Sequence, residues 1–133
     1  MATAVAPGAS AGDRLRWGRV IGLAFALEVV LFVTLVPLQP LLARNTWFAA
    51  VTFGCVLFGY IAGRLAARGL RSQAVIHGLL VGILATIIYL VICALAPGGI
   101  AAAVAVYGAP LFVLLNALRI AGCTAGAVHG KPR

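Results

Sequence analysis

Charged residues are scarce in this chain. Of its 133 residues only 9% are charged, and just two are acidic, whereas soluble proteins carry roughly a quarter charged residues. Hydrophobic residues make up 64% of the chain. The composition therefore excludes an ordinary soluble domain and predicts an integral membrane protein.

Groups that carry catalysis are equally rare. The two acidic residues, Asp13 and Glu28, are not spaced as a pair for acid–base chemistry, and Ser10 and Ser72 have no neighbouring base. The three cysteines fall within or at the ends of apolar stretches and lack the paired spacing of a metal site or a disulfide framework. We therefore expect a protein that is not an enzyme and that holds neither a cofactor nor a metal.

Four apolar stretches are long enough to cross a membrane, because a spanning helix needs about 20 mainly apolar residues. They cover residues 20–42, 46–65, 74–96 and 100–128. The first follows basic residues, as the core of a secretion signal does, but it is longer than such a core and ends in prolines, so we expect it to be retained. The predicted fold is all-α: a disordered basic segment over 1–17, a four-helix transmembrane bundle over 18–128 with no soluble catalytic domain, and a basic tail over 129–133.

Basic residues favour one side of this predicted bundle. Nine of them flank helix ends on the side that carries both termini, and only Arg44 lies on the other. The nine are Arg14, Arg16, Arg19, Arg64, Arg68, Arg71, Arg119, Lys131 and Arg133. Because Lys and Arg are retained on the cytoplasmic side, we expect both termini in the cytoplasm. The net charge of +8 then faces anionic lipid headgroups, and nucleic acid is not needed as a partner.

Each apolar stretch carries two glycines four residues apart. The pairs are Gly18/Gly22, Gly59/Gly63, Gly78/Gly82 and Gly122/Gly126. Small residues at this spacing let membrane helices approach closely, and in an up-down-up-down chain all four pairs lie near the cytoplasmic side. We expect a bundle that is narrow there and wider on the outer side, with interfacial tryptophans at Trp17 on the inside and Trp47 on the outside.

The glycine pairs also suggest an internal duplication. A shift of 60 residues places Gly18 on Gly78 and Pro37 on Pro97, and a shift of 63 places Gly59 on Gly122. We infer two copies of a helical hairpin, over about 18–66 and 78–128, related by a pseudo-twofold axis along the membrane normal. Chance alignment of glycine- and alanine-rich apolar sequence is the alternative.

Glu28 is the one acidic residue within a predicted span. An ionised carboxylate at that depth costs at least a few kcal/mol unless it is paired or hydrated, and Arg119 in the fourth stretch is its best partner. Asn116 precedes Arg119 by one helical turn, on the same face. The functional interpretation is a proton- or cation-responsive site formed by Glu28, Asn116 and Arg119. The alternative is a structural clamp between two helices.

Two further groups of polar residues have less specific interpretations. The loop arginines Arg64, Arg68 and Arg71 could bind an anionic lipid headgroup or an acidic partner, or serve only as an orientation signal. His77 and His129 are expected as polar helix-end residues in the membrane interface.

The order of these segments resembles a known type of small membrane protein. The basic start and the Gly-rich first stretch are followed by Gly59-Tyr-Ile-Ala-Gly-Arg-Leu-Ala66 and His77-Gly-Leu-Leu-Val-Gly82, an order similar to small bacterial four-helix membrane proteins of the YrzE-like type. The resemblance implies a four-helix inner-membrane protein without catalytic residues. A glutamate in the first helix is also similar to small multidrug exporters, although the charge bias and the aliphatic neighbours of Glu28 depart from them.

Two functions follow from these expectations. The first is a non-enzymatic accessory or scaffold subunit that associates with itself or with other membrane subunits through glycine-rich helix faces. The second is a proton-coupled small-molecule transporter of the efflux type, centred on Glu28.

Overall fold

The computed structural model describes residues 15–70 and 72–130. In chain order its elements are α1 (Trp17–Leu35), the 3-10 helix η2 (Val36–Leu41), α2 (Arg44–Ala67), α3 (Ala74–Leu95), α4 (Gly99–Tyr107) and α5 (Ala109–Gly130). The described part of the chain contains no strand. Four helical segments are long and apolar enough to cross a membrane: α1 together with η2, α2, α3 and α5. The prediction of an all-helical, multi-pass membrane protein is confirmed.

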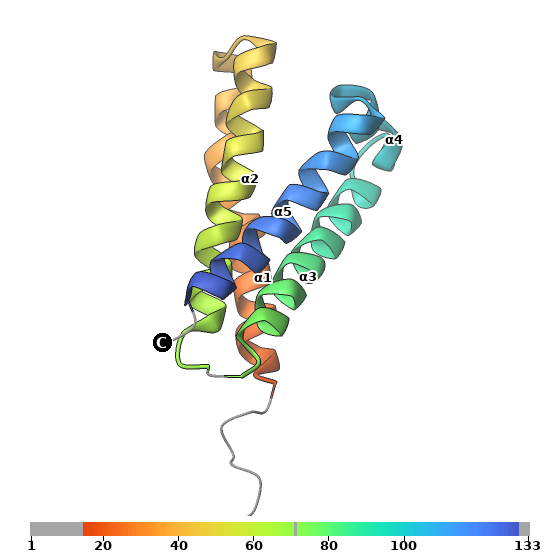
Figure 1. Ribbon diagram of the computed structural model, residues 1–133. Helices are drawn as coiled ribbons and strands as arrows, with labels where there is room; N and C mark the ends of the chain where they lie inside the picture. Colours follow the sequence, from red (N-terminus) through yellow and green to blue (C-terminus); the bar gives the residue numbers. More distant parts are fainter. Residues whose placement is uncertain (1–14, 71, 131–133) are drawn as a thin grey trace, which may run out of the picture.

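The helices form two hairpins that diverge. Helix α1 runs beside α2, and α3 runs beside α5 (Figure 1). The two hairpins cross at one end of the molecule, where α1 and α3 begin and α2 and α5 end. They separate toward the other end, which carries η2 and α4. We call these the closed end and the open end. The taper agrees with the narrowing that the glycine positions predict.

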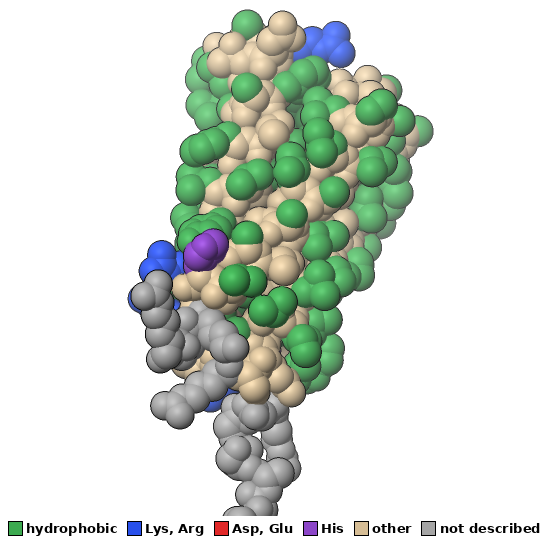
Figure 2. Space-filling model, viewed as in Figure 1, with side chains coloured by type: hydrophobic (Ala, Val, Ile, Leu, Met, Phe, Trp, Pro, Cys, Tyr) green, Lys and Arg blue, Asp and Glu red, His purple; other side chains and the backbone are tan. Residues whose placement is uncertain are grey.

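The surface of this body is apolar along its length. Hydrophobic side chains are spread along the visible face, with backbone between them, while Lys and Arg side chains lie toward its two ends (Figure 2). Large exposed side chains include Phe25 at 60%, Phe53 at 67% and Val113 at 65% exposure. Such a surface is stable against lipid rather than water.

The fourth predicted span is not one helix. The stretch 100–128 is divided at Gly108, which has φ +78°, into the short helix α4 and the spanning helix α5. Glycine adopts this left-handed conformation without the strain that a side chain would cause. Pro110, at the second position of α5, is tolerated there because the first turn of a helix leaves its N–H groups free. The prediction of a continuous fourth helix was wrong, because its apolar composition concealed the Gly108-Ala-Pro110 break.

Helices α2 and α5 cross with their backbones in contact. A Cβ atom added at Gly63 would overlap the backbone of Cys123, and one added at Gly126 would overlap the backbone of Tyr60. A Cβ at Gly122 would lie 2.9 Å from the carbonyl oxygen of Val56. The glycine faces of α2 and α5 therefore pack against each other reciprocally, which gives the dense van der Waals contact on which membrane helices depend.

The glycine face of α3 packs on the same helix. A Cβ at Gly82 would lie 2.7 Å from Cα of Ile120, and one at Gly78 would meet Ala127 and the backbone of Cys123. Helix α5 is thus held between α2 and α3 near the closed end. Any residue larger than glycine at these positions would push the helices apart.

The first glycine pair does not pack within the chain. Gly18 and Gly22 are exposed, and a Cβ at either position would have nothing within 4 Å. Helix α1 instead turns a stripe inward that includes Val20, Ala24 and Leu27. The prediction that all four pairs mark close helix crossings within the bundle was therefore wrong for Gly18/Gly22.

Candidate functional site

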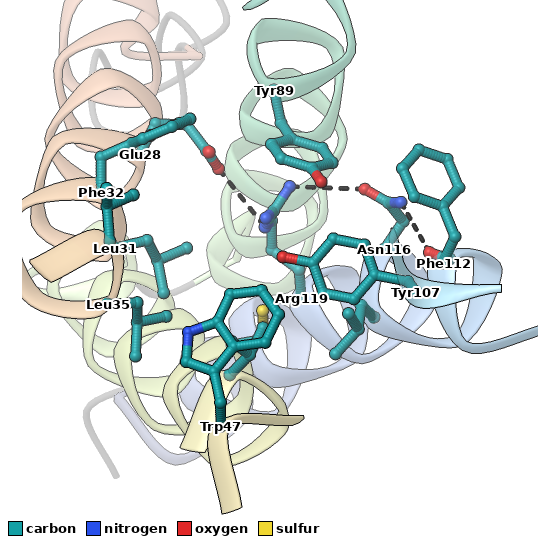
Figure 3. A pocket seen from close by; sticks show the side chains of 14 residues that line it. Glu28, Leu31, Phe32, Leu35, Trp47, Tyr89, Tyr107, Phe112, Asn116 and Arg119 are labelled. Carbon is teal, nitrogen blue, oxygen red and sulfur yellow. Dashed lines mark hydrogen bonds and ion pairs between the residues drawn. The ribbon is translucent and has the colours of Figure 1, made fainter. Parts of the chain in front are cut away.

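A cavity lies between the diverging hairpins and extends from the open end to the middle of the bundle. All four long helices line it, and α4 closes part of its mouth with Tyr107 (Figure 3). Its volume is about 70 Å³, which is room for several water molecules. Aliphatic side chains such as Leu31, Leu35 and Val51 form much of the wall.

The floor of the cavity is an ion pair. Nε of Arg119 lies 3.3 Å from Oε1 of Glu28, and the two residues are only 5% and 2% exposed. Nη1 of Arg119 donates a hydrogen bond of 3.4 Å to Oδ1 of Asn116, whose Nδ2 donates to the carbonyl oxygen of Phe112 at 2.8 Å. The guanidinium carbon also lies 4.6 Å from the centre of the Tyr89 ring, in cation–π geometry. The structure thus brings together the three residues that the sequence groups, Glu28, Asn116 and Arg119 (Figure 3).

Each member of this group is placed by its helix. Glu28 lies on the inward stripe of α1, between Ala24 and Leu31. Asn116 and Arg119 are three residues apart on α5, which places them on one face. Arg119 is ten residues from the start of α5 at Ala109, and so about 15 Å along the helix at ~1.5 Å per residue. It therefore does not belong to the basic residues at the closed end, and the described residues place four arginines at that end and Arg44 at the other.

Several polar atoms around the cavity have no partner. Neither carboxylate oxygen of Glu28 has a hydrogen-bond partner among the described residues, and the same holds for Nε of Arg119 and the indole N–H of Trp47. Buried polar groups are almost always hydrogen-bonded, because an unmade bond costs about 1–3 kcal/mol. These atoms therefore favour an additional molecule in the cavity.

Aromatic side chains enclose the outer part of the cavity. The Trp47 and Tyr107 rings stack with centroids 5.4 Å apart and planes at 18°, and Phe48 lies 5.5 Å from the first and 5.8 Å from the second. Trp47 is only 7% exposed, so its prediction as an interfacial anchor was wrong; Trp17, at 57% exposure, is free to take that role. Sequence reasoning missed the convergence of Trp47 and Tyr107, because they lie on segments 60 residues apart and only the folding back of α4 joins them.

The basic residues of the closed end have different environments. Arg19 donates hydrogen bonds to the carbonyl oxygens of Leu65 and Arg68 and so caps the last turn of α2. Arg64 and Arg68 are exposed and remain candidates for anionic lipid. Arg71, the third arginine of the predicted group, lies outside the described residues.

The two histidines also differ. His77 is fully buried: its Nε2 accepts a hydrogen bond of 3.1 Å from the backbone N–H of Arg16, and its Nδ1 is 2.8 Å from the carbonyl oxygen of Gln73. It connects the start of α3 to the residue before α1, and so it lies at a helix end, as predicted, but as a buried residue. His129 is exposed, as a helix-end residue would be. The described residues contain no group of three His, Cys, Asp or Glu side chains that could hold a metal ion.

No family model matches the chain, and no curated protein or solved structure is significantly similar to it. The resemblance to the YrzE-like type therefore stays a prediction, and the functional argument depends on the geometry of the cavity.

Proposed function

We propose that this protein is a non-enzymatic bacterial inner-membrane protein that admits a small molecule into the cavity between its hairpins and transports it, with Glu28 as the group that takes up and releases a coupled proton. The observation that carries the proposal is the Glu28–Arg119 pair at the cavity floor. Both residues are buried, yet both carboxylate oxygens lack a hydrogen-bond partner among the described residues.

This observation argues against a purely structural clamp. A buried ion pair stabilises a protein only when further hydrogen bonds satisfy its remaining atoms, because removing two charges from water is costly. The present pair makes one contact of 3.3 Å and keeps its other acceptor sites free beside an open cavity. An ion pair with unmade hydrogen bonds is typical of a site that binds a ligand.

The charge distribution supports an orientation for the proposal. With Arg119 assigned to the cavity, four basic residues of the described part of the chain lie at the closed end, namely Arg16, Arg19, Arg64 and Arg68, and Arg44 lies at the open end. The positive-inside rule then puts the closed end and both termini in the cytoplasm. The cavity would open toward the outer side, and exposed Arg64 and Arg68 would face anionic headgroups of the inner leaflet.

Helix α4 is a candidate gate for this opening. Its first residues adjoin Gly98 and Gly99, with φ +83° and +63°, and Gly108 follows its last residue with φ +78°. The Tyr107 ring that it carries is stacked on Trp47. Movement of this short helix about its glycine ends would unstack the rings and widen the mouth without moving the long helices.

Cysteine labelling tests access to the cavity. In a variant whose native cysteines are replaced by alanine, Val51→Cys should react from the outer side with a small charged methanethiosulfonate, because Val51 lines the cavity. Transport further requires that the same thiol react when the reagent is supplied from the cytoplasmic side, in inverted vesicles. The measurement is the mass increase of the purified protein.

Val56→Cys is the matched control for this experiment, because Val56 lies on the same helix but is 39% exposed on the lipid-facing surface. A charged reagent needs water and should leave it unlabelled. Labelling of Val51→Cys from the outside alone would contradict transport, and no labelling from either side would contradict an accessible cavity.

A second candidate function has its own observation. The exposed Gly18/Gly22 pair, with exposed Ala26 one turn further along α1, forms a small-residue face that none of the described residues covers. In this chain the other three glycine pairs all contact helix backbones or small side chains. We propose that this face joins an accessory subunit to a second copy or to another membrane protein.

Leucine at both Gly18 and Gly22 tests this second function. The bulkier face should abolish association while the bundle stays folded, because no atom of the described residues lies within 4 Å of either added Cβ. Chemical cross-linking in native membranes, followed by purification, measures the association. Unchanged cross-linked species would contradict an interface at this face.

The proposed duplication of a hairpin has one structural support. The second and fourth glycine pairs, which the shift of 63 residues superimposes, pack on each other reciprocally, as an axis between α2 and α5 requires. Gly78/Gly82 pack on α5 whereas Gly18/Gly22 are exposed, so any symmetry is broken at α1.

A further inference from the structure

The polar and apolar surfaces of the cavity together restrict what it can bind. Its floor presents a carboxylate and a guanidinium 3.3 Å apart, so the charges of the floor cancel at any position equally distant from both. Its outer wall presents the Trp47 and Tyr107 rings. Resting on the proposed binding function, we propose that the cavity takes a small uncharged molecule with one flat ring and one polar group that both donates and accepts hydrogen bonds, such as an amide.

The hydrogen-bonding groups of the floor match such a polar group. Oε2 of Glu28 has no partner among the described residues, and Oε1 and Nε of Arg119 face each other at 3.3 Å without forming a hydrogen bond. A primary amide offers N–H donors to the carboxylate and a carbonyl oxygen to the guanidinium. A group that only donates or only accepts would leave one side of the floor unpaired, and an unpaired buried polar atom weakens binding.

A charged ligand gains little from this floor. A cation drawn to Glu28 is repelled by Arg119 at nearly the same distance, and an anion drawn to Arg119 is repelled by Glu28. Either ion loses its hydration on entering a cavity with mostly apolar walls. The net attraction is therefore small while the desolvation cost is full, and an uncharged molecule avoids that cost.

The dimensions limit the apolar part to one ring. Glu28 and Leu35 are seven residues apart on α1, which is about 10 Å along the helix at ~1.5 Å per residue. The cavity volume is about 70 Å³, roughly half of the ~150 Å³ that encloses benzene, so the polar group would enter the cavity and the ring would stay in its open outer part. A single ring with its polar group directed to the floor would lie beside Trp47 and Tyr107. The stacked geometry of those two rings indicates that flat surfaces are accommodated there.

Three planar compounds of nearly equal shape test the ligand class: benzamide is uncharged, benzamidine is a cation and benzoate is an anion. The chain has two tryptophans, so Trp17→Phe leaves Trp47 as the sole tryptophan reporter in the cavity. Titration of the full-length variant in nanodiscs should give saturable quenching of Trp47 by benzamide at concentrations about tenfold or more below those of the two ions.

Two substitutions locate the binding. Leu115→Phe, at a cavity-lining residue that is 6% exposed, should abolish quenching by benzamide, whereas Leu114→Phe, at its lipid-facing neighbour with 49% exposure, should leave it unchanged. Tighter binding of benzamidine or benzoate would overturn the ligand class but leave the proposed function standing. If none of the three compounds quenched Trp47, the ligand class would be overturned as well. The labelling of Val51→Cys would then decide whether the proposed accessible cavity is also contradicted.

Discussion

Replacing Gly126 with alanine is expected to destabilise the bundle strongly, by about 3 kcal/mol or more, at the upper end of the cost of overpacked contacts. The added Cβ would overlap the carbonyl of Tyr60 and lie 2.9 Å from the backbone nitrogen of Arg64. Backbone atoms cannot rotate away as a side chain can, so α2 and α5 would have to separate and lose their van der Waals contact. Unfolding of the purified protein in mixed detergent micelles, followed by circular dichroism, measures the effect.

Gly22→Ala is the matched control. Both substitutions gain the same intrinsic helix propensity, but a Cβ at Gly22 meets nothing within 4 Å, so the free energy of unfolding should not fall by more than about 0.5 kcal/mol. Equal losses at the two positions would contradict the backbone contact between α2 and α5. A larger loss at Gly22 would instead show that the α1 face is packed against another molecule.

This comparison shows what glycine spacing can and cannot predict. A separation of four residues gives a helix a flat face, and so it indicates that a second backbone can approach. The spacing does not predict which helix packs against that face. Gly122/Gly126 and Gly18/Gly22 have the same pattern, yet the first pair meets α2 and the second faces outward. The difference depends on the rotation of each helix about its axis, which buried side chains elsewhere on the helix determine.

Hydropathy predicted the spanning helices because lipid imposes one rule on every backbone group: its hydrogen bond must be made within the helix. The residues around Gly108 and the aromatic cluster are governed by local geometry instead. Helix α4 returns along the open end and brings Tyr107 onto Trp47. These two residues belong to different apolar stretches, so the periodicity of either stretch does not predict their contact. His77 similarly gains its second hydrogen bond from Arg16, outside its own helix.

The group of Glu28, Asn116 and Arg119 could be predicted because a buried carboxylate has few possible partners in this sequence. A carboxylate in the middle of a membrane requires a partner, and Arg119 is the one basic residue of the sequence deep enough within a predicted span to supply it. Asn116 followed from helical spacing. The cavity above the pair was not predictable, because it arises from the divergence of the two hairpins rather than from any single residue.

Removing either charge of the Glu28–Arg119 pair is expected to have unequal effects. Glu28→Gln leaves a buried guanidinium with no anion beside it, and such a loss typically costs about 3–5 kcal/mol. Arg119→Gln leaves a carboxylate, which can bind a proton and become neutral, whereas a guanidinium stays charged. The free energy of unfolding should therefore fall more for Glu28→Gln than for Arg119→Gln, as measured in the same detergent system.

The double variant Glu28→Gln with Arg119→Gln completes the cycle. It contains no buried charge, so it should be more stable than Glu28→Gln alone, with a coupling energy of about 0.5–3 kcal/mol. Equal losses in the two single variants and no coupling would mean that Arg119 is hydrated independently of Glu28, which contradicts a buried pair.

The same double variant separates a clamp from a binding floor. If the pair serves only to join α1 to α5, restoring stability with two uncharged amides should have no effect on quenching of Trp47 by benzamide. If the pair is the floor of a ligand site, stability should return while the affinity for benzamide falls by about tenfold or more, because a hydrogen bond to a charged group is worth roughly 1.5–3 kcal/mol and both charged partners are gone. Stability and binding would then respond oppositely to one pair of substitutions, a result that a structural clamp does not produce.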